Sequence, residues 1–268
     1  MLVAIKTMAP FFMAGVRYVI AGTLLMVILA LRGSTLPTAQ QWKNAALIGS
    51  LLLLVGNGAV AFALQYINSS TTALTLATTP AWAAVITIAL TASKPRSIEW
   101  AGIALGIAGV ALLHYRNPLP MHPVGLLALL VATVSWALGS MWVKQLAMPR
   151  GLMSSAAQML AGGLMLLVVS WASGESWGQL PSTESLVALA YLVVFGAIVA
   201  FSAYGYLLHT VSPTLATSNT LVNPLVAVII GVGLGGEPFN AMIIVAMLII
   251  LLGVGLLAVA HEAPQEPA

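Results

Sequence analysis

The chain has 268 residues, of which 60% are hydrophobic and 6% are charged, and its mean hydropathy is +1.05. A soluble domain cannot bury that much apolar surface, so the composition excludes one and predicts a protein dissolved in a lipid bilayer. The formal charge of +3 comes from nine basic residues and six glutamates, too few for a nucleic-acid-binding surface. The chain has no cysteine, which excludes disulfides, thiolate metal sites and cysteine nucleophiles.

Nine apolar stretches are long enough to cross a bilayer, which takes roughly 20 helical residues at about 1.5 Å each. They are predicted at residues 10–31, 44–66, 69–92, 98–115, 122–147, 151–173, 185–209, 212–235 and 239–260. The predicted fold class is therefore an all-α integral membrane protein with nine transmembrane helices. The tail at residues 261–268, with its prolines and glutamates, is expected to be disordered.

Basic residues are concentrated in alternate loops, which predicts the orientation of the chain. One set of loops contains Arg32, Lys43, Lys94, Arg96, Lys144 and Arg150. The other set contains Lys6, Arg116, Glu175, Glu184 and Glu237. Because cytoplasmic loops accumulate Lys and Arg, the first set is expected in the cytoplasm together with the C-terminus.

The two halves of the chain carry matching segments. NSSTTALTLATTPAWAAVITIAL surrounds Pro80, and VSPTLATSNTLVNPLVAVIIGVGL surrounds Pro224, 144 positions later (224 − 80). Further upstream Lys6 aligns with Lys144, and this places Met1 opposite the middle of a helix. The first repeat is therefore expected to lack its first helix. Five helices per repeat would insert with opposite topology, so the sequence predicts an inverted 5+5 helix repeat with one helix missing.

Three segments resemble a known family, the EamA-type branch of the drug/metabolite transporter superfamily and, within it, the bacterial YedA-like members. SPTLATSNTLVNPLVAVIIGVGLGGE is similar to the family's ninth helix and the turn after it, VSWALGSMWV to the sixth helix, and AGVRYVIAG to the second. The resemblance covers nearly the whole chain. It implies a first EamA-like repeat of four helices at residues 1–116, a second of five helices at 121–260, and a central cavity between them.

The same resemblance implies a function, which is secondary transport across the inner membrane by alternating access. Members of the family are often exporters of amino acids, related metabolites or drugs. The expected partners are a small-molecule solute and the lipid bilayer. A homodimer is compatible with the sequence, and no nucleic-acid partner is expected. The helices at 98–115 and 239–260 carry almost no polar residues, so they are expected at the periphery.

Polar side chains inside the spans are the candidate solute-binding residues, because a polar group at that depth is costly. The candidates are Arg17, Asn57, Thr79, Trp136, Gln158, Tyr204, Asn219 and Asn223. Arg17 would either attract a carboxylate or phosphate or snorkel to the interface, and the sequence favours neither. Asn219 and Asn223 would either line the cavity or bond neighbouring helices. Pro80 and Pro224 are expected to kink their helices, since proline has no N–H to donate.

The alternatives to a transporter are a membrane-embedded enzyme and a non-transporting membrane subunit. An enzyme would need a nucleophile with its base, or a metal cluster, but the four histidines lie scattered near span ends without an HExxH motif. No catalytic residue, metal or cofactor is therefore predicted. Every glutamate falls at a span end, in a loop or in the tail, so coupling to protons through a buried carboxylate is not supported.

Overall fold

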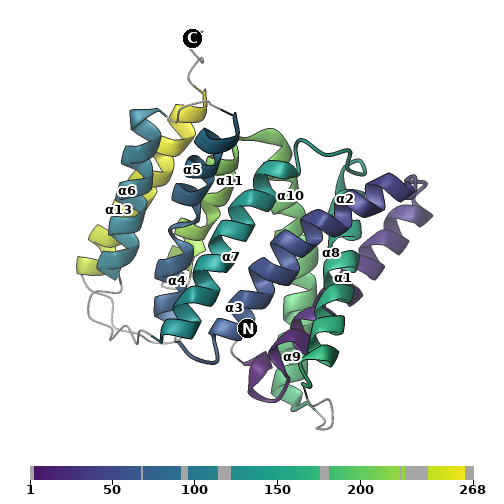
Figure 1. Cartoon of the computed structure of the whole chain (residues 1–268). Helices are drawn as coiled ribbons and strands as arrows, with labels where there is room; N and C mark the ends of the chain where they lie inside the picture. The colour runs from purple at the N-terminus through teal and green to yellow at the C-terminus, as the bar shows by residue number, and fades with distance from the viewer. Residues whose placement is uncertain are drawn as a thin grey trace.

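The computed structural model describes residues 3–67, 69–91, 96–113, 122–175, 181–223, 225–226 and 241–262. These residues form helices joined by turns, and no strand occurs among them. The predicted all-α membrane fold is confirmed. Figure 1 shows the helices side by side in one bundle, with α6 and α13 at one edge, α1 and α8 at the other, and α7 between them.

The first half of the chain begins with a short 3-10 helix, and its continuous helix at Ala39–Ala63 contains a π-helical segment. Its elements are η1 (Ala4–Lys6), α1 (Pro10–Leu31), α2 (Ala39–Gly49), η2 (Ser50–Asn57), α3 (Gly58–Ala63), α4 (Ser69–Leu76), α5 (Thr79–Thr91) and α6 (Ser97–Leu113). The π-helical segment is η2, and the helix runs without a break from α2 through η2 to α3.

The second half begins with α7, and from α8 onward its elements follow the same order as those of the first half from α1 onward. Its elements are α7 (Pro123–Trp142), α8 (Leu152–Ala172), α9 (Thr183–Tyr191), η3 (Leu192–Val199), α10 (Ala200–Thr210), α11 (Pro213–Thr217) and α13 (Ala241–Glu262). Here the π-helical segment is η3, between α9 and α10. The expected tail overlaps α13 by two residues, and 263–268 lie outside the described residues.

Seven helices in the described part of the chain are long and apolar enough to cross a membrane. The shorter apolar helix at Ser97–Leu112 corresponds to the span predicted at 98–115. Pro224 and residues 227–235 of the span predicted at 212–235 lie outside the described residues. The count of nine transmembrane helices therefore stays a prediction.

Two predicted boundaries were wrong, the start of the second span and the end of the fifth. The span expected to start at 44 starts at Ala39, because Thr38 caps it and exchanges hydrogen bonds with Gln41. The span expected at 122–147 ends at Trp142. The span expected at 69–92 is present as an apolar helical run at Thr71–Leu90, and it divides into α4 and α5 just before Pro80, where a kink is expected. There the Thr79 hydroxyl donates to the carbonyl of Leu76 at 2.6 Å, which satisfies the carbonyl that the proline leaves without an N–H.

Equivalent elements of the two halves are separated by a nearly constant number of residues. From α1 to α8 the starts differ by 142 (152 − 10), from η2 to η3 by 142 (192 − 50), and from α6 to α13 by 144 (241 − 97). Equivalent helices also pack together, α1 against α8 and α6 against α13. π-helical segments are rare in proteins, so one at the same place in each half is strong evidence of internal duplication.

Glycine allows α1 and α8 to approach until their backbones touch. A Cβ added at Gly22 would lie 2.6 Å from the backbone nitrogen of Leu160, and one added at Gly163 would lie 2.7 Å from that of Val19. Because lipid tails are as apolar as leucine, close packing of small residues is a main source of helix association in a bilayer. This pair of helices is therefore closely packed.

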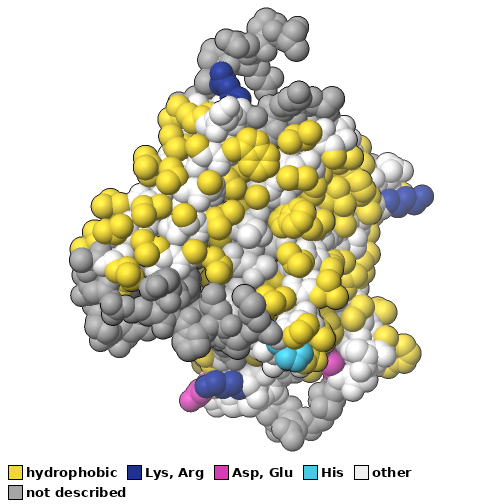
Figure 2. Space-filling model, turned by 60° about the vertical axis from the view of Figure 1, so that its left-hand side comes forward, with side chains coloured by type: hydrophobic (Ala, Val, Ile, Leu, Met, Phe, Trp, Pro, Cys, Tyr) yellow, Lys and Arg dark blue, Asp and Glu magenta, His cyan; other side chains and the backbone are white. Residues whose placement is uncertain are grey.

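The surface matches a membrane environment. In Figure 2 apolar side chains cover the middle of the face shown, whereas the charged side chains lie at its margins. Large apolar residues such as Leu127, Val168 and Leu248 are exposed on separate helices. In a bilayer these side chains contact lipid rather than water.

Candidate functional site

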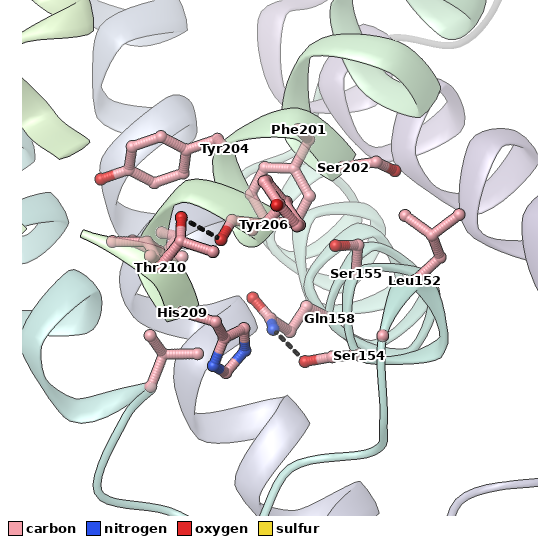
Figure 3. A pocket seen from close by; sticks show the side chains of 15 residues that line it. Leu152, Ser154, Ser155, Gln158, Phe201, Ser202, Tyr204, Tyr206, His209 and Thr210 are labelled. Atoms are coloured by element: carbon pink, nitrogen blue, oxygen red, sulfur yellow. Dashed lines mark hydrogen bonds between the residues drawn. The ribbon is translucent and has the colours of Figure 1, made fainter.

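A cavity of about 240 Å³ lies between the first turns of α8 and the length of α10. Leu52 of η2 and Val143, just beyond α7, complete its wall. Figure 3 shows the side chains that surround it. The lining residues from α8 and α10 are Leu152, Ser154, Ser155, Gln158, Phe201, Ser202, Tyr204, Gly205, Tyr206, Leu208, His209 and Thr210, with Gly151 before α8.

Helix α8 turns one polar face toward the cavity. Gly151, Ser154, Ser155 and Gln158 follow the spacing i, i+3, i+4, i+7, which places them on one side of a helix. The side-chain amide of Gln158 donates to the Ser154 hydroxyl at 2.9 Å (Figure 3). Because the Ser154 oxygen accepts this bond, its own proton remains available to donate.

Helix α10 contributes a second polar face with the same spacing. Ser202, Gly205, Tyr206 and His209 lie at i, i+3, i+4 and i+7, and all line the cavity. The Ser202 oxygen is buried and has no hydrogen-bond partner among the described residues. A Cβ at position 205 would lie 2.6 Å from the Ser155 hydroxyl oxygen. Only glycine therefore leaves room for that hydroxyl beside α10.

The inner wall is fixed by a chain of hydrogen bonds between α10 and α7. The Ser140 hydroxyl donates to the backbone carbonyl of Trp136 at 2.6 Å, so the Tyr204 hydroxyl, 2.6 Å from Ser140, is the donor of the next bond. The rings of Trp136 and Tyr204 are 5.5 Å apart. A Cβ at Gly56 would lie 2.9 Å from the Trp136 ring, so η2 closes over this aromatic pair.

Arg17 is buried on α1 but does not line the cavity. Its guanidinium donates to the hydroxyl of Tyr18 and lies 4.2 Å from the centre of that ring. Tyr18 in turn contacts the ring of Phe201, which lines the cavity, at 6.4 Å. Arg17 is thus connected to the cavity through two aromatic rings, and its Nε has no hydrogen-bond partner among the described residues.

The other predicted site residues take different places. Gln158 and Tyr204 line the cavity, and Trp136 lies directly behind Tyr204. Asn57 donates its amide to the Leu52 carbonyl of its own helix at 3.2 Å, and Thr79 bonds Leu76. Neither of these two lines the cavity, and the same holds for the two asparagines near residue 220. Of this pair, Asn219 has a buried side-chain oxygen without a partner in the described part of the chain, and Asn223 is exposed.

The sequence analysis did not identify Ser154, Ser155, Ser202 and His209 as one set of cavity-lining residues, although their spacing in the sequence indicates it. Both polar faces have helical i, i+3, i+4, i+7 spacing, and each lies within an otherwise apolar helix. Counting that spacing in each span would have found Ser154, Ser155, Ser202 and His209. The sequence analysis instead ranked single residues by the free-energy cost of placing a polar side chain in the membrane, and this criterion favoured Arg17.

The end of the cavity near the loops is electropositive. Arg150 directly precedes Gly151, and the ammonium group of Lys144 donates to the Val211 carbonyl just beyond α10 at 2.6 Å. Lys144 lies beyond the end of α7, where partial burial lowers its pKa from the usual value. No carboxylate is among the described residues that line the cavity. Among the described residues, no group of three or more His, Cys, Asp or Glu side chains could hold a metal ion.

A separate network closes the opposite end of α8, and we call it the outer seam. The Glu175 carboxylate accepts the backbone N–H groups of Phe11 and Phe12, at 3.0 and 2.9 Å, at the start of α1. The Thr7 hydroxyl donates to the Ser185 hydroxyl at 2.8 Å. The seam joins α1 to the segment between α8 and α9, whereas the cavity lies at the beginning of α8.

The fold and the site together define a class of protein. A bundle of membrane-crossing helices with interrupted, internally duplicated spans, and with a small cavity edged by polar groups between them, is the arrangement of a solute carrier.

Comparison with known proteins gives the family. The chain belongs to the EamA-like transporter family, whose model matches residues 1–115 and 123–259. It is 42% identical to the uncharacterized inner membrane transporter YedA of Escherichia coli (strain K12), over 99% of this chain and 87% of that protein. It is also 26% identical to the protein PecM of Dickeya dadantii (strain 3937), over 88% of this chain and 82% of that one.

A solved crystal structure shares the fold, with a TM-score of 0.78 and 17% sequence identity over 97% of this chain and 93% of that chain. The resemblance stated from the sequence is confirmed. The chain is a YedA-like membrane transporter of the inner membrane.

Proposed function

We propose that this protein is a secondary transporter that exports small metabolites by alternating access, and that the cavity between α8 and α10 is its solute site. The observation that carries the proposal is the meeting of two polar helical faces around an otherwise apolar cavity. Amino acids, related metabolites and small drugs are the solutes considered. Pockets for drug-sized ligands measure roughly 300 to 1,000 Å³. The volume of about 240 Å³ favours a solute of amino-acid size.

Alternating access is supported by the opposite states of the two ends of α8. The cavity adjoins the loop that holds Lys144 and Arg150, whereas the outer seam joins the far end of α8 to α1. Loops rich in Lys and Arg are cytoplasmic as a rule. The structure thus corresponds, in this proposal, to an inward-facing state that receives solute from the cytoplasm, with the C-terminus also on that side.

Two inverted repeats are the proposed basis of the movement. The constant spacing of equivalent elements and the matching π-helical segments support two repeats, at residues 1–116 and 121–260. The family match also divides into two parts, at residues 1–115 and 123–259. In transporters built this way, one repeat rocks against the other around a fixed site.

An enzyme and a non-transporting subunit are the alternatives. An enzymatic role has little support, because the described residues that line the cavity include neither a carboxylate nor a lysine, and His209 among them is exposed. A non-transporting subunit does not explain why the polar faces of α8 and α10 meet at a cavity. A homodimer is also proposed, and the mass of the protein–detergent complex in solution tests it.

Reconstitution into liposomes tests the proposal. Wild-type protein should support counterflow of at least one solute in a panel of amino acids, organic acids, nucleosides and cationic drugs. Gly205→Leu should fill the cavity and abolish that uptake. Gly255→Leu is the matched control, because a Cβ at Gly255 meets no atom within 4 Å. Equal uptake by both variants, or no protein-dependent uptake of any solute, would contradict the proposal.

A further inference from the structure

Helices α1 and α8 end in the same backbone motif, in which a glycine with positive φ is followed by a residue whose N–H bonds the carbonyl five residues back. After α1 these residues are Gly33, with φ of +85°, and Ser34, whose N–H bond is 3.0 Å long. After α8 they are Gly174, with φ of +70°, and Glu175, whose N–H bond is 3.1 Å long. The two motifs are 141 residues apart (175 − 34). Ser34 therefore takes the place in the first repeat that Glu175 takes in the second.

The surroundings of this position also correspond in the two repeats. At the outer seam the Ser185 hydroxyl, near the start of α9, donates to the Val3 carbonyl before α1 at 3.1 Å. At the cavity end the side-chain amide of Asn44, near the start of α2, donates to the Ala147 carbonyl before α8 at 2.9 Å. Helices α2 and α9 start 144 residues apart (183 − 39), so they are equivalent. Each end of the bundle thus has a side chain of one repeat bonded to the segment before the first long helix of the other.

The two ends differ in one carboxylate. Glu175 accepts the N–H groups of Phe11 and Phe12, the second and third residues of α1. The second and third residues of α8 are Met153 and Ser154, and no side chain in the described part of the chain caps that helix. A negative charge stabilises the N-terminus of a helix, so Glu175 favours the arrangement of the outer end in which it lies against α1. The uncharged Ser34 provides no such bond at the cavity end.

The turn that Glu175 holds takes part in closing the outer end. The ring of Phe11 stacks on that of Phe62 of α3, with centroids 6.2 Å apart and planes 10° apart. Helices α3 and α10 start 142 residues apart (200 − 58), so the contact of α1 with α3 corresponds to that of α8 with α10. The second of these contacts contains the cavity, whereas the first contains stacked aromatic rings. The carboxylate is thus found at the closed member of the pair.

We propose that Glu175 keeps the outer end closed in the protein without solute, and that the lack of a carboxylate at Ser34 leaves the cavity end open. A single difference between equivalent positions of the repeats therefore determines which end is open at rest. This inference rests on the proposed alternating access, and it assigns the resting state to two residues outside the cavity.

A carboxylate introduced at the cavity end tests the inference by a gain of closure. Ser34 is exposed, so Ser34→Glu disturbs no packing and can reach the first turn of α8 as Glu175 reaches that of α1. The reporter is the single thiol of Ser155→Cys in the cavity wall of this cysteine-free chain. Labelling uses methyl methanethiosulfonate, because the new charge does not change the local concentration of an uncharged reagent. Ser34→Glu should slow labelling about fivefold or more, as expected for a new hydrogen bond to a charged group.

Two further variants separate the position of the charge from its presence. Leu36→Glu places the same charge at an exposed site in the same loop but outside the motif, and should label at the wild-type rate. Ser34→Glu combined with Glu175→Ser exchanges the two equivalent residues. It should label more slowly than wild type at Ser155→Cys and faster than wild type at Ser185→Cys in the outer seam, each thiol being introduced separately.

The outcomes distinguish this inference from the function on which it rests, because labelling needs no solute. Wild-type labelling of Ser155→Cys in the Ser34→Glu protein, or equal slowing by Leu36→Glu, would overturn the role of this position. An exchanged variant in which the outer thiol does not label faster would overturn the role of Glu175. Labelling as expected from a protein that takes up no solute in the liposome panel would overturn the transport proposal alone.

Discussion

Glu175→Gln should loosen the outer seam. In the wild type the carboxylate accepts two backbone N–H groups, those of Phe11 and Phe12, at the positive end of α1. Glutamine has the same shape but only one accepting oxygen, so one bond and the charge are lost. A hydrogen bond to a charged group contributes about 1.5 to 3 kcal/mol. Because this site is half-buried and partly screened, we expect a loss of about 1 to 2 kcal/mol.

A loss of that size raises the open fraction of the seam about 5- to 30-fold. Because the chain has no cysteine, a single Ser185→Cys substitution, at a buried seam position, reports opening through its rate of labelling by a membrane-impermeant maleimide. Adding Glu175→Gln should raise the labelling rate by this factor. Glu184→Gln, an exposed position on α9, is the control. Equal labelling rates with and without Glu175→Gln would refute the proposal that the outer seam holds this end of the protein closed.

Three further substitutions test the packing around the site. Tyr204→Phe removes the bond to Ser140 and should lower the unfolding free energy by about 1 to 2 kcal/mol in detergent, and combining it with Ser140→Ala should add little more. Gly22→Val places a side chain against the α8 backbone and should cost about 1 to 3 kcal/mol, measured as a fall in Tm, while Gly255→Val should leave Tm unchanged. Arg17→Gln should keep the fold and slow counterflow of anionic solutes, because it removes the positive charge behind Tyr18 and Phe201; unchanged counterflow would assign Arg17 a packing role.

Much of the fold could be predicted from sequence because hydropathy and helix breakers act locally. Seven long apolar helices lie where apolar runs were found, and the break before Pro80 follows from its missing N–H. The π-helical segments could not be predicted, since an insertion of one residue in a helix leaves no hydropathy signal. The start at Ala39 was missed because the polar first turn after Thr38 falls outside the apolar run.

The site was only partly predictable because the direction of a side chain depends on packing. Gln158 and Tyr204 line the cavity, but Arg17 lies behind two rings. Asn57 bonds the Leu52 carbonyl of its own helix, and Thr79 bonds the Leu76 carbonyl three residues before it, a local alternative that is always open to short polar side chains.

Protection of a cysteine in the cavity tests the central claim most directly. Ser155→Cys places one thiol in the wall of the cavity at a buried position, so a small methanethiosulfonate reagent has to enter the cavity to reach it. In inside-out vesicles we expect labelling from the cytoplasmic side, and a saturating concentration of a transported solute should slow it about tenfold or more. Labelling that is unaffected by a solute the same protein transports would show that solute passes elsewhere, and would contradict the assignment of this cavity as the transport site.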